Sequence, residues 1–254
     1  MDNNMILIKG NCVETMNNLK DNSVDLIVTD PPYNLGNFMR NRATNLKKMR
    51  NNFFGDAGWD DLEFEDWIEH MDSFFEQSQR ILKKGGSIIM FMSLIKVETI
   101  IKLAEKNKFY YKTTGVWHKT NPMPRNMNLH FINSVEGWIY FTNITKTGTF
   151  NNNGTAIHDY IESSVTPKSE KIYGGHPTQK PEKVIQHFVE LLSNPGEVVM
   201  DPFMGSGTTG VVAKKLGRDF IGIELQEDYF DISLKRISDV STNKKYELKV
   251  INGD

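Results

Sequence analysis

The segment that most constrains the fold is a glycine-rich turn between a short apolar run and a helical pattern. Residues 197–200 form the apolar run, and Gly205, Gly207 and Gly210 follow it closely. Glycines at this spacing let the backbone approach a ligand, and the N-terminus of the next helix favours a carboxylate or phosphate. The spacing therefore predicts a strand, a tight turn and a helix that together bind a cofactor.

An acidic residue ends the next apolar run, residues 220–224. Glu224 can accept hydrogen bonds from ribose hydroxyls, which both S-adenosylmethionine and NAD offer. A P-loop is excluded, because Thr208 and Thr209 stand where a Lys-Ser/Thr pair would be needed. The glycine turn alone leaves both cofactors open.

The rest of the chain alternates in the same way. Its 254 residues fit one domain. Strands that alternate with helices predict an open, mostly parallel α/β sheet with helices on both faces. The predicted strands are Val24–Thr29 and residues 87–92, 110–117, 135–142, 197–200 and 220–224, and the predicted helices are residues 65–82, 95–107, 180–193, 208–216 and 227–239.

Three segments break this alternation. Residues 34–58 are polar and aperiodic, which is uncommon in a compact domain unless the loop is functional. Residues 143–175 are rich in Asn, Thr, Gly and Ser and predict a small irregular module. Residues 244–254 form a polar tail with no predicted element, and Gly85-Gly86 are expected to end the helix at 65–82.

The charge is nearly balanced, with 30 Lys and Arg against 32 Asp and Glu. A net charge of −2 argues mildly against a nucleic-acid partner. Residues 39–50, however, hold five basic side chains and no acidic one, so they can contact phosphates. We predict DNA contacts for this loop and for two further cations: Arg40, Arg42, Lys47, Lys48, Arg50, Lys119 and Arg125.

The sequence predicts no membrane span, no signal peptide and no metal site. No apolar run is long enough for a membrane span, and the first residues do not resemble a signal peptide. The single cysteine, Cys12, excludes an internal disulfide and fits a reducing cytoplasm. His118 and His176 lack metal-ligand spacing, so we predict no metal site. Cys12 also lacks the Pro-Cys context of a nucleophile, and a small buried hydrophobe is its commoner role.

The second informative motif is Asp30-Pro31-Pro32-Tyr33, directly after the strand Val24–Thr29. Two prolines stiffen the turn and leave carbonyl groups without local donors. The Asp30 carboxylate and the Pro31 carbonyl are then paired acceptors at a strand end, which suits an –NH2 group. Tyr33 adds a flat face that can hold an aromatic ring.

Together these motifs resemble the amino-methyltransferases that modify DNA, of restriction-modification type. Asp30–Tyr33 resembles that family's catalytic motif, residues 201–207 its cofactor motif, and residues 176–181 a third element. The catalytic motif comes first, which resembles the β order of the family. An aspartate in its first position resembles the N6-adenine branch, whereas the N4-cytosine branch usually carries serine there. Residues 121–126 resemble a segment of some small members.

The resemblance implies a Rossmann-like methyltransferase sheet with a small recognition insertion at 143–175 and a mobile DNA-contacting loop at 34–58. It implies that Asp30 and Pro31 hold the target amine of a flipped adenine and that Tyr33 stacks on it, within a turn stiffened by Pro32. It places Asn11 and Cys12 at the adenine of S-adenosylmethionine, Glu224 at its ribose and Lys180 near its carboxylate. Around the methionine part it places Asp201, Phe203, Gly205, Ser206, Gly207 and Thr208. Along the pocket it also places Asp30, His176, Thr178 and Gln179.

The implied partners are double-stranded DNA and a cognate restriction endonuclease, with a homodimer left open because the recognition region is short. Four alternatives also stay open. They are N4-cytosine methylation, methylation of RNA or protein amides, an NAD-dependent oxidoreductase, and a DNA-binding protein without activity. The oxidoreductase alternative leaves Asp30–Tyr33 unexplained.

Overall fold

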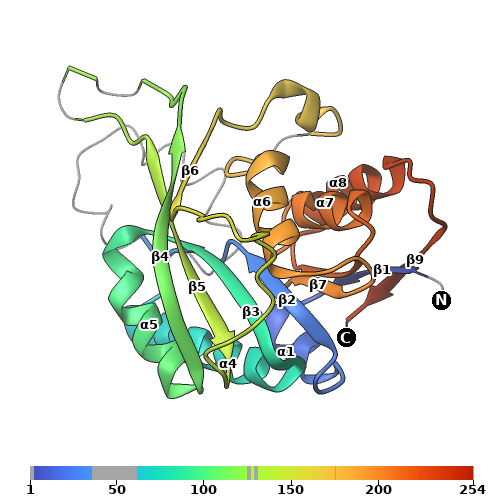
Figure 1. Cartoon of the computed structure of the whole chain (residues 1–254). Coiled ribbons are helices and arrows are strands. Elements are labelled where there is room, and N and C mark those ends of the chain that lie inside the picture. Colours follow the sequence, from blue (N-terminus) through green and yellow to red (C-terminus); the bar gives the residue numbers. More distant parts are fainter. Residues whose placement is uncertain (1–2, 36–61, 125–126, 129–130, 175, 254) are drawn as a thin grey trace.

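The computed structural model describes residues 3–35, 62–124, 127–128, 131–174 and 176–253. In this part of the chain, nine strands form one sheet in the order β6-β4-β5-β3-β2-β7-β8-β1-β9 (Figure 1). No helix of the described ranges has the length and apolar content of a membrane span. The strands are β1 (Asn3–Lys9), β2 (Val24–Thr29), β3 (Leu82–Met92), β4 (Phe109–Lys119), β5 (Val135–Asn143), β6 (Tyr160–Ser163), β7 (Val198–Asp201), β8 (Asp219–Glu224) and β9 (Tyr246–Asn252).

Most neighbouring strands are parallel, which confirms the predicted open α/β sheet. Strand β2 pairs in parallel with β3 and β7, and β8 pairs in parallel with β7 and β1. Strand β5 runs the other way and is antiparallel to both β3 and β4. The beginning of β5 therefore lies at the same edge of the sheet as the carboxyl ends of its neighbours.

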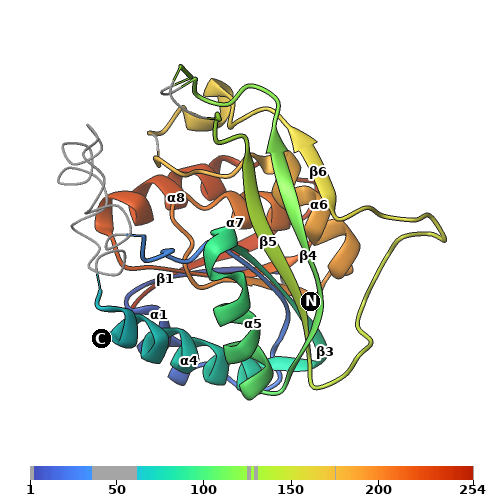
Figure 2. The same ribbon diagram turned by 90° about the vertical axis from the view of Figure 1, so that its left-hand side faces the viewer.

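Helices cover both faces of the sheet (Figures 1 and 2). On one face, α1 (Cys12–Asn17), α4 (Phe64–Ile81) and α5 (Val97–Lys106) contribute to one apolar cluster. On the other face, α6 (Glu182–Leu192), α7 (Thr208–Lys215) and α8 (Glu227–Asp239) contribute to a second. Two short 3-10 turns, η2 (Leu94–Lys96) and η3 (Lys168–Lys171), complete the described elements.

Helix α4 shows how the sequence produces this layering. Trp67, Met71, Phe74 and Ser78 recur every three or four residues and are fully or almost fully buried. Burying each large apolar side chain contributes about 1.5–3 kcal/mol, which outweighs the absence of a side-chain cap at Glu63. The predicted helix at residues 65–82 is thus confirmed with slightly shifted bounds.

Some expectations at the ends of elements were wrong. Helix α4 ends at Ile81, before Gly85-Gly86, and both glycines lie within β3. Gly85 adopts φ +81°, and a Cβ there would lie 3.0 Å from the backbone oxygen of Thr147. The chain therefore needs glycine for a close approach within the strand.

The polar tail was also predicted wrongly. Tyr246–Asn252 forms β9, which pairs in parallel with β1 at the edge of the sheet. Almost all of its side chains are exposed, as expected for a strand at the edge of the sheet. It consequently lacks the apolar run by which the inner strands were recognised. The strand β1 and the short helix α1 were not predicted either.

The predicted recognition region, residues 143–175, divides into two parts in the structure. Gly148 lies against Gly85 at the start of β3, and the backbone N–H of Asn151 donates to Leu191 at the end of α6 (2.8 Å). This first part is therefore at the pole opposite the carboxyl end of β2. Strand β6 runs parallel to β4, so the chain after Ser163 emerges at the same edge as Asp30.

Candidate active site

A cavity of about 450 Å³ opens at the carboxyl ends of the parallel strands. It brings together every predicted catalytic residue and every predicted cofactor residue except Gly207. Gly207 precedes α7 with φ +79°, and a Cβ there would lie 2.8 Å from Cβ of Ser233. Because Gly207 has no side chain, α7 can pack closely against α8. Gly207 therefore faces α8 and does not line the cavity. The predicted residues around the cavity are Asn11, Cys12, Asp30, Pro31, Pro32, Tyr33, His176, Thr178, Gln179, Lys180, Asp201, Phe203, Gly205, Ser206, Thr208 and Glu224.

The glycine turn is held by hydrogen bonds from two sides. The Glu224 carboxylate accepts from the backbone N–H of Gly205 (2.7 Å) and of Gln226 (2.8 Å). Buried Arg236 on α8 donates to the backbone oxygen of Ser206 (2.7 Å) and to the Thr208 hydroxyl (3.0 Å). These contacts fix the turn before a ligand arrives. Burial raises the pKa of Glu224.

Asp201 connects this turn to the catalytic strand. Its carboxylate accepts from the hydroxyls of Thr29 (3.1 Å) and Thr209 (2.7 Å) and from the backbone N–H of Phe203 (3.2 Å). Burial raises the pKa of Asp201 to about 7, although these three donors act in the opposite direction. The ends of β2 and β7 are thus joined by a buried carboxyl group.

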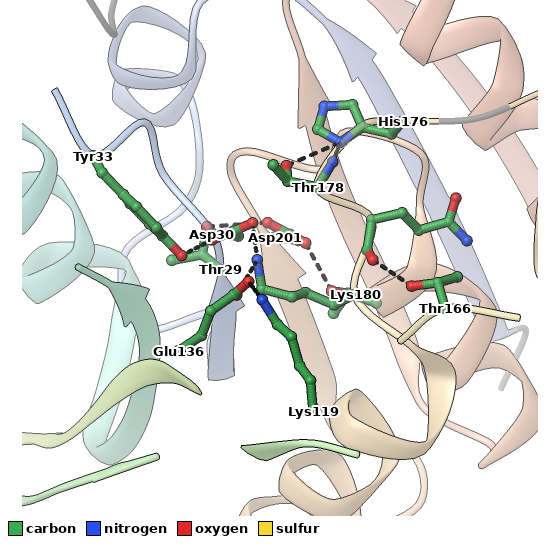
Figure 3. Close-up of polar contacts among 12 residues, drawn as sticks. Thr29, Asp30, Tyr33, Lys119, Glu136, Thr166, His176, Thr178, Lys180 and Asp201 are labelled. Carbon is green, nitrogen blue, oxygen red and sulfur yellow. Dashed lines mark hydrogen bonds and ion pairs between the residues drawn. The ribbon is translucent and has the colours of Figure 1, made fainter. Parts of the chain in front are cut away.

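The catalytic turn is held by one contact from helix α4 and by one hydrogen bond within the turn itself. The indole N–H of Trp67 on α4 donates to the backbone oxygen of Pro32 (3.2 Å). The Tyr33 hydroxyl donates to Oδ1 of Asp30 (2.6 Å), so its ring extends across the turn (Figure 3). Both prolines line the cavity with Asp30, as expected for a stiff turn at its mouth.

A chain of alternating charges begins at Asp30. The Lys180 ammonium donates to Oδ2 of Asp30 and lies 3.2 Å from Oε2 of Glu136 on β5, while Lys119 on β4 donates to Oε1 of Glu136 (Figure 3). Burial opposes the charge of Lys180, but the Asp30 and Glu136 carboxylates outweigh it and raise the pKa of Lys180. Burial, with the Glu136 charge, raises the pKa of Asp30, and Lys180 and the Tyr33 hydroxyl oppose this rise.

This arrangement changes the expected role of Lys180. We expected its ammonium near the carboxylate of the cofactor, but the structure places it on the catalytic carboxylate. The Lys180 side chain is only 6% exposed, and its nitrogen lies 5.0 Å from the centre of the Phe91 ring. Two carboxylates and one aromatic face surround the three N–H donors of the ammonium. The residue still lines the cavity.

The segment with His176, Thr178 and Gln179 lies over the glycine turn. The His176 ring meets the ring of Tyr229 edge-on, with centroids 4.3 Å apart. Burial, followed by the charges of Lys180 and Lys171, lowers the pKa of His176 to about 4. His176 is therefore a neutral side chain. Gln179 is buried and donates to the backbone oxygen of Glu170 (2.9 Å).

Asn11 and Cys12 form the start of α1 beside Glu224. The Asn11 side chain accepts from the backbone N–H of Val13 (3.0 Å) and of Glu14, which caps the helix. Burial raises the pKa of Cys12 to about 12, so the side chain is a thiol. A thiol is a poor nucleophile, which agrees with the prediction that Cys12 has a packing role.

Of the predicted DNA-contacting residues, the structure describes only Lys119. Lys119 was expected to contact DNA, but its ammonium pairs with Glu136, lies 5.0 Å from the Trp117 ring centre and belongs to a side chain 17% exposed. Because its charge is already compensated inside the site, it is poorly placed for a phosphate. The other predicted contacts lie outside the described residues: Arg40, Arg42, Lys47, Lys48, Arg50 and Arg125.

The sequence reasoning missed two charged residues of the site. Glu136 stands alone within the strand sequence of β5, and only strand pairing places it near Lys119 and Lys180. Arg236 looks like a surface residue of an amphipathic helix, yet it is buried. A charge within an otherwise apolar strand was the one signal that could have indicated Glu136. Among the described residues, no group of three His, Cys, Asp or Glu side chains is arranged for a metal ion.

The donor set fits S-adenosylmethionine. Glu224 offers carboxylate oxygens to a ribose, Gly205, Ser206 and Thr208 line the cavity, and the remaining lining is largely apolar. A sheet of this topology with a glycine turn facing an Asp-Pro-Pro-Tyr turn defines the class of S-adenosylmethionine-dependent methyltransferases. The chain belongs to the family described as DNA methylase, whose profile matches residues 24–235.

Individual relatives agree with this assignment. The type II methyltransferase M.HinfI of Haemophilus influenzae is 34% identical over 255 residues, covering 93% of this chain and 69% of that protein. The type II methyltransferase M2.DpnII of Streptococcus pneumoniae is 33% identical, covering 92% of this chain and 90% of that protein. The protein is therefore a DNA methyltransferase, and the oxidoreductase and non-catalytic alternatives are excluded.

Solved structures show the same fold. The crystal structure of the M1.HpyAVI-SAM complex matches with a TM-score of 0.66 and 27% identity, covering 92% of this chain and 100% of that chain. The PvuII DNA methyltransferase, named as cytosine-N4-specific, matches with a TM-score of 0.74 and 19% identity, covering 95% of this chain and 89% of that chain. At that identity the likeness concerns the fold alone.

Proposed function

We propose that this DNA methyltransferase modifies the N6 amine of adenine, in a base flipped out of double-stranded DNA at a specific site. The observation that carries the proposal is the aspartate at the mouth of the cavity, in the position where the resembling N4-cytosine enzymes usually have serine. An ionised carboxylate accepts an N–H of the target amine strongly. Lys180 supports this role, because its contact favours the ionised form of Asp30.

The residues of the catalytic turn divide the work. Asp30, with the Pro31 carbonyl, would accept both N–H groups of the target amine and localise the nitrogen lone pair for attack. Tyr33 would release Asp30 and stack on the extruded base. S-adenosylmethionine supplies an electrophilic methyl group on a sulfonium sulfur. The apolar lining excludes water from the reacting groups.

The remaining parts are assigned by position. Asn11, Cys12 and Glu224 would hold the adenosine part of the cofactor, and the glycine turn its methionine part. DNA would lie across the edge where β4, β5 and β6 open toward the cavity. Residues 34–58 and the second part of 143–175, with the connection between β4 and β5, would contact the target sequence.

The base specificity is tested by product analysis. Unmethylated double-stranded DNA, total RNA and a protein mixture are incubated separately with labelled S-adenosylmethionine, digested and separated. Label in N6-methyladenine of DNA supports the proposal. Label in N4-methylcytosine, or only in RNA or protein, contradicts it. Asp30→Ala is expected to abolish transfer while S-adenosylhomocysteine still binds.

A biological partner and an oligomeric state complete the proposal. The two curated relatives are named type II methyltransferases. We therefore propose that a restriction endonuclease recognises the same sequence, and DNA from cells expressing the methyltransferase should resist that enzyme. A homodimer stays a prediction, which sedimentation of the purified protein would decide.

A further inference from the structure

The charged chain behind the catalytic turn connects four elements that are distant in sequence. Asp30 follows β2, Glu136 is the second residue of β5, Lys119 ends β4 and Lys180 precedes α6. Glu136 lies opposite Trp117 in the antiparallel pair, which places Lys119 diagonally beside it. The Glu136 carboxylate thus has one oxygen on Lys119 and the other toward Lys180.

Both oxygens of Asp30 are occupied in this state. Oδ1 accepts from Tyr33, and Oδ2 accepts from Lys180. Since Tyr33 has to move to stack on a base, Oδ1 is the oxygen that becomes free for the target amine. Lys180 must meanwhile stay on Oδ2, because otherwise the carboxylate could rotate or take up a proton.

Glu136 is the contact that can keep Lys180 in place. A lysine side chain has several rotatable bonds and no planar fork, so one carboxylate contact does not fix its direction. Glu136 provides a second contact from an inner strand of the sheet, and Lys119 prevents Glu136 itself from turning away. Phe91 closes the remaining side of the ammonium.

We propose that Glu136 is a positioning residue for methyl transfer, which holds Lys180 on Asp30 so that the free oxygen of Asp30 faces the target amine. The inference rests on the proposed role of Asp30. Misplacing a catalytic group by about 1 Å costs about 100-fold in rate. We therefore expect Glu136→Gln to lower kcat about tenfold to 100-fold.

The same geometry predicts a change in the pH profile. Asp201, His176 and Tyr33 also lie beside this row of charged side chains, and the substitution does not change them. In Glu136→Gln, Lys180 is no longer held on Asp30, and the loss of its charge outweighs the loss of the repulsive Glu136 charge. The pKa of Asp30 therefore rises, and the acid limb moves to higher pH. Lys180 loses one of its two carboxylates, so its pKa falls and the alkaline limb moves to lower pH.

The experiment compares Glu136→Gln and Glu136→Asp with the wild-type enzyme in steady-state and single-turnover methylation of unmethylated DNA across pH. The matched control is Glu98→Gln, which breaks an exposed ion pair with Lys102 on α5 (2.6 Å) outside the cavity. We expect the control to behave as wild type and Glu136→Asp to recover part of the rate. Affinity for S-adenosylhomocysteine and the KM for DNA should change less than about threefold.

Two outcomes would overturn the inference. One is a Glu136→Gln enzyme with unchanged kcat and pH profile. The other is a loss of rate that only follows a loss of S-adenosylhomocysteine binding and of Tm, because a structural role alone would produce it. If the Glu136→Gln enzyme does not fold, Lys119→Met tests the same row of charged side chains and should lower kcat several-fold. If the wild-type enzyme labels a product other than N6-methyladenine, the proposed base specificity is wrong. The ratio of the variant rate to the wild-type rate still tests the role of Glu136.

Discussion

Replacing Tyr33 with phenylalanine removes the hydroxyl that occupies Asp30 and keeps the ring that would stack on the base. Because the hydroxyl donates to Oδ1 at 2.6 Å, a target amine can reach that oxygen only after this bond opens. A hydrogen bond to a charged group contributes about 1.5–3 kcal/mol net, and about 1.4 kcal/mol corresponds to tenfold in affinity. Water accepts the released hydroxyl, so the lower bound applies, and Tyr33→Phe should lower the KM for DNA about tenfold.

The same substitution has a defined effect on pH dependence. The Tyr33 hydroxyl lowers the pKa of Asp30, so its removal raises that pKa further. Transfer needs the carboxylate, and therefore the acid limb of the activity profile should move to higher pH. Tyr33→Ala, in contrast, also removes stacking worth about 1–3 kcal/mol and should lose most of the rate.

The assay is methylation of unmethylated double-stranded DNA with labelled S-adenosylmethionine, measured under steady-state and single-turnover conditions. Wild type, Tyr33→Phe and Tyr33→Ala are compared over a range of pH. The reasoning is refuted if Tyr33→Phe raises the KM as much as Tyr33→Ala does, or if its acid limb moves to lower pH. Either result would mean that the hydroxyl assists base binding instead of competing with it.

Three further substitutions test the framework of the site. Because the pKa of Asp201 is raised to about 7, the folded chain holds a proton that the unfolded chain has released, and stability falls as pH rises from the ordinary aspartate pKa to about 7. Asp201→Asn should flatten this dependence in urea unfolding, and an unchanged slope would contradict the assignment. Gly207→Ala places a Cβ 2.8 Å from Ser233 at φ +79° and should lower the free energy of unfolding by about 1–3 kcal/mol, together with S-adenosylhomocysteine affinity. Trp67→Phe removes the donor to Pro32 and should cost about 1–3 kcal/mol in the same unfolding assay and several-fold in kcat, whereas unaltered kinetics would show that the turn does not need this anchor.

The sequence predicted the parts of the fold whose cause is local. Residues 208–216 were expected as a helix after the glycine turn, and α7 spans Thr208–Lys215. The inner strands other than β1 were found because burial on both faces requires continuous apolar runs. Strand β9 was missed because an exposed edge strand is stabilised by backbone pairing with β1 and carries no continuous apolar run.

The residues of the site also divide into those that a local motif reveals and those that only strand pairing brings together. Asp30–Tyr33 and the glycine turn are contiguous motifs, so their residues could be named and their common cavity anticipated. Glu136 and the pairing of Lys119 depend on the antiparallel register of β4 with β5, which no local pattern encodes. Lys180 lines the cavity as expected, but its contacts with Asp30 and Glu136 were not anticipated, because these two acidic partners meet it only in the folded sheet.

The reversed direction of β5 has a consequence for how such an enzyme can acquire new target sequences. The connection from β4 to β5 and the segment after β6 both leave the sheet at the edge of the catalytic turn, while the parallel strands carry the chemistry behind them. A hairpin connection can be lengthened or exchanged without altering the register of the strands that it joins. On the proposed assignment of target recognition to these segments, loops grafted between Lys119 and Val135 should redirect the enzyme to other sites while its methyl-transfer rate is preserved.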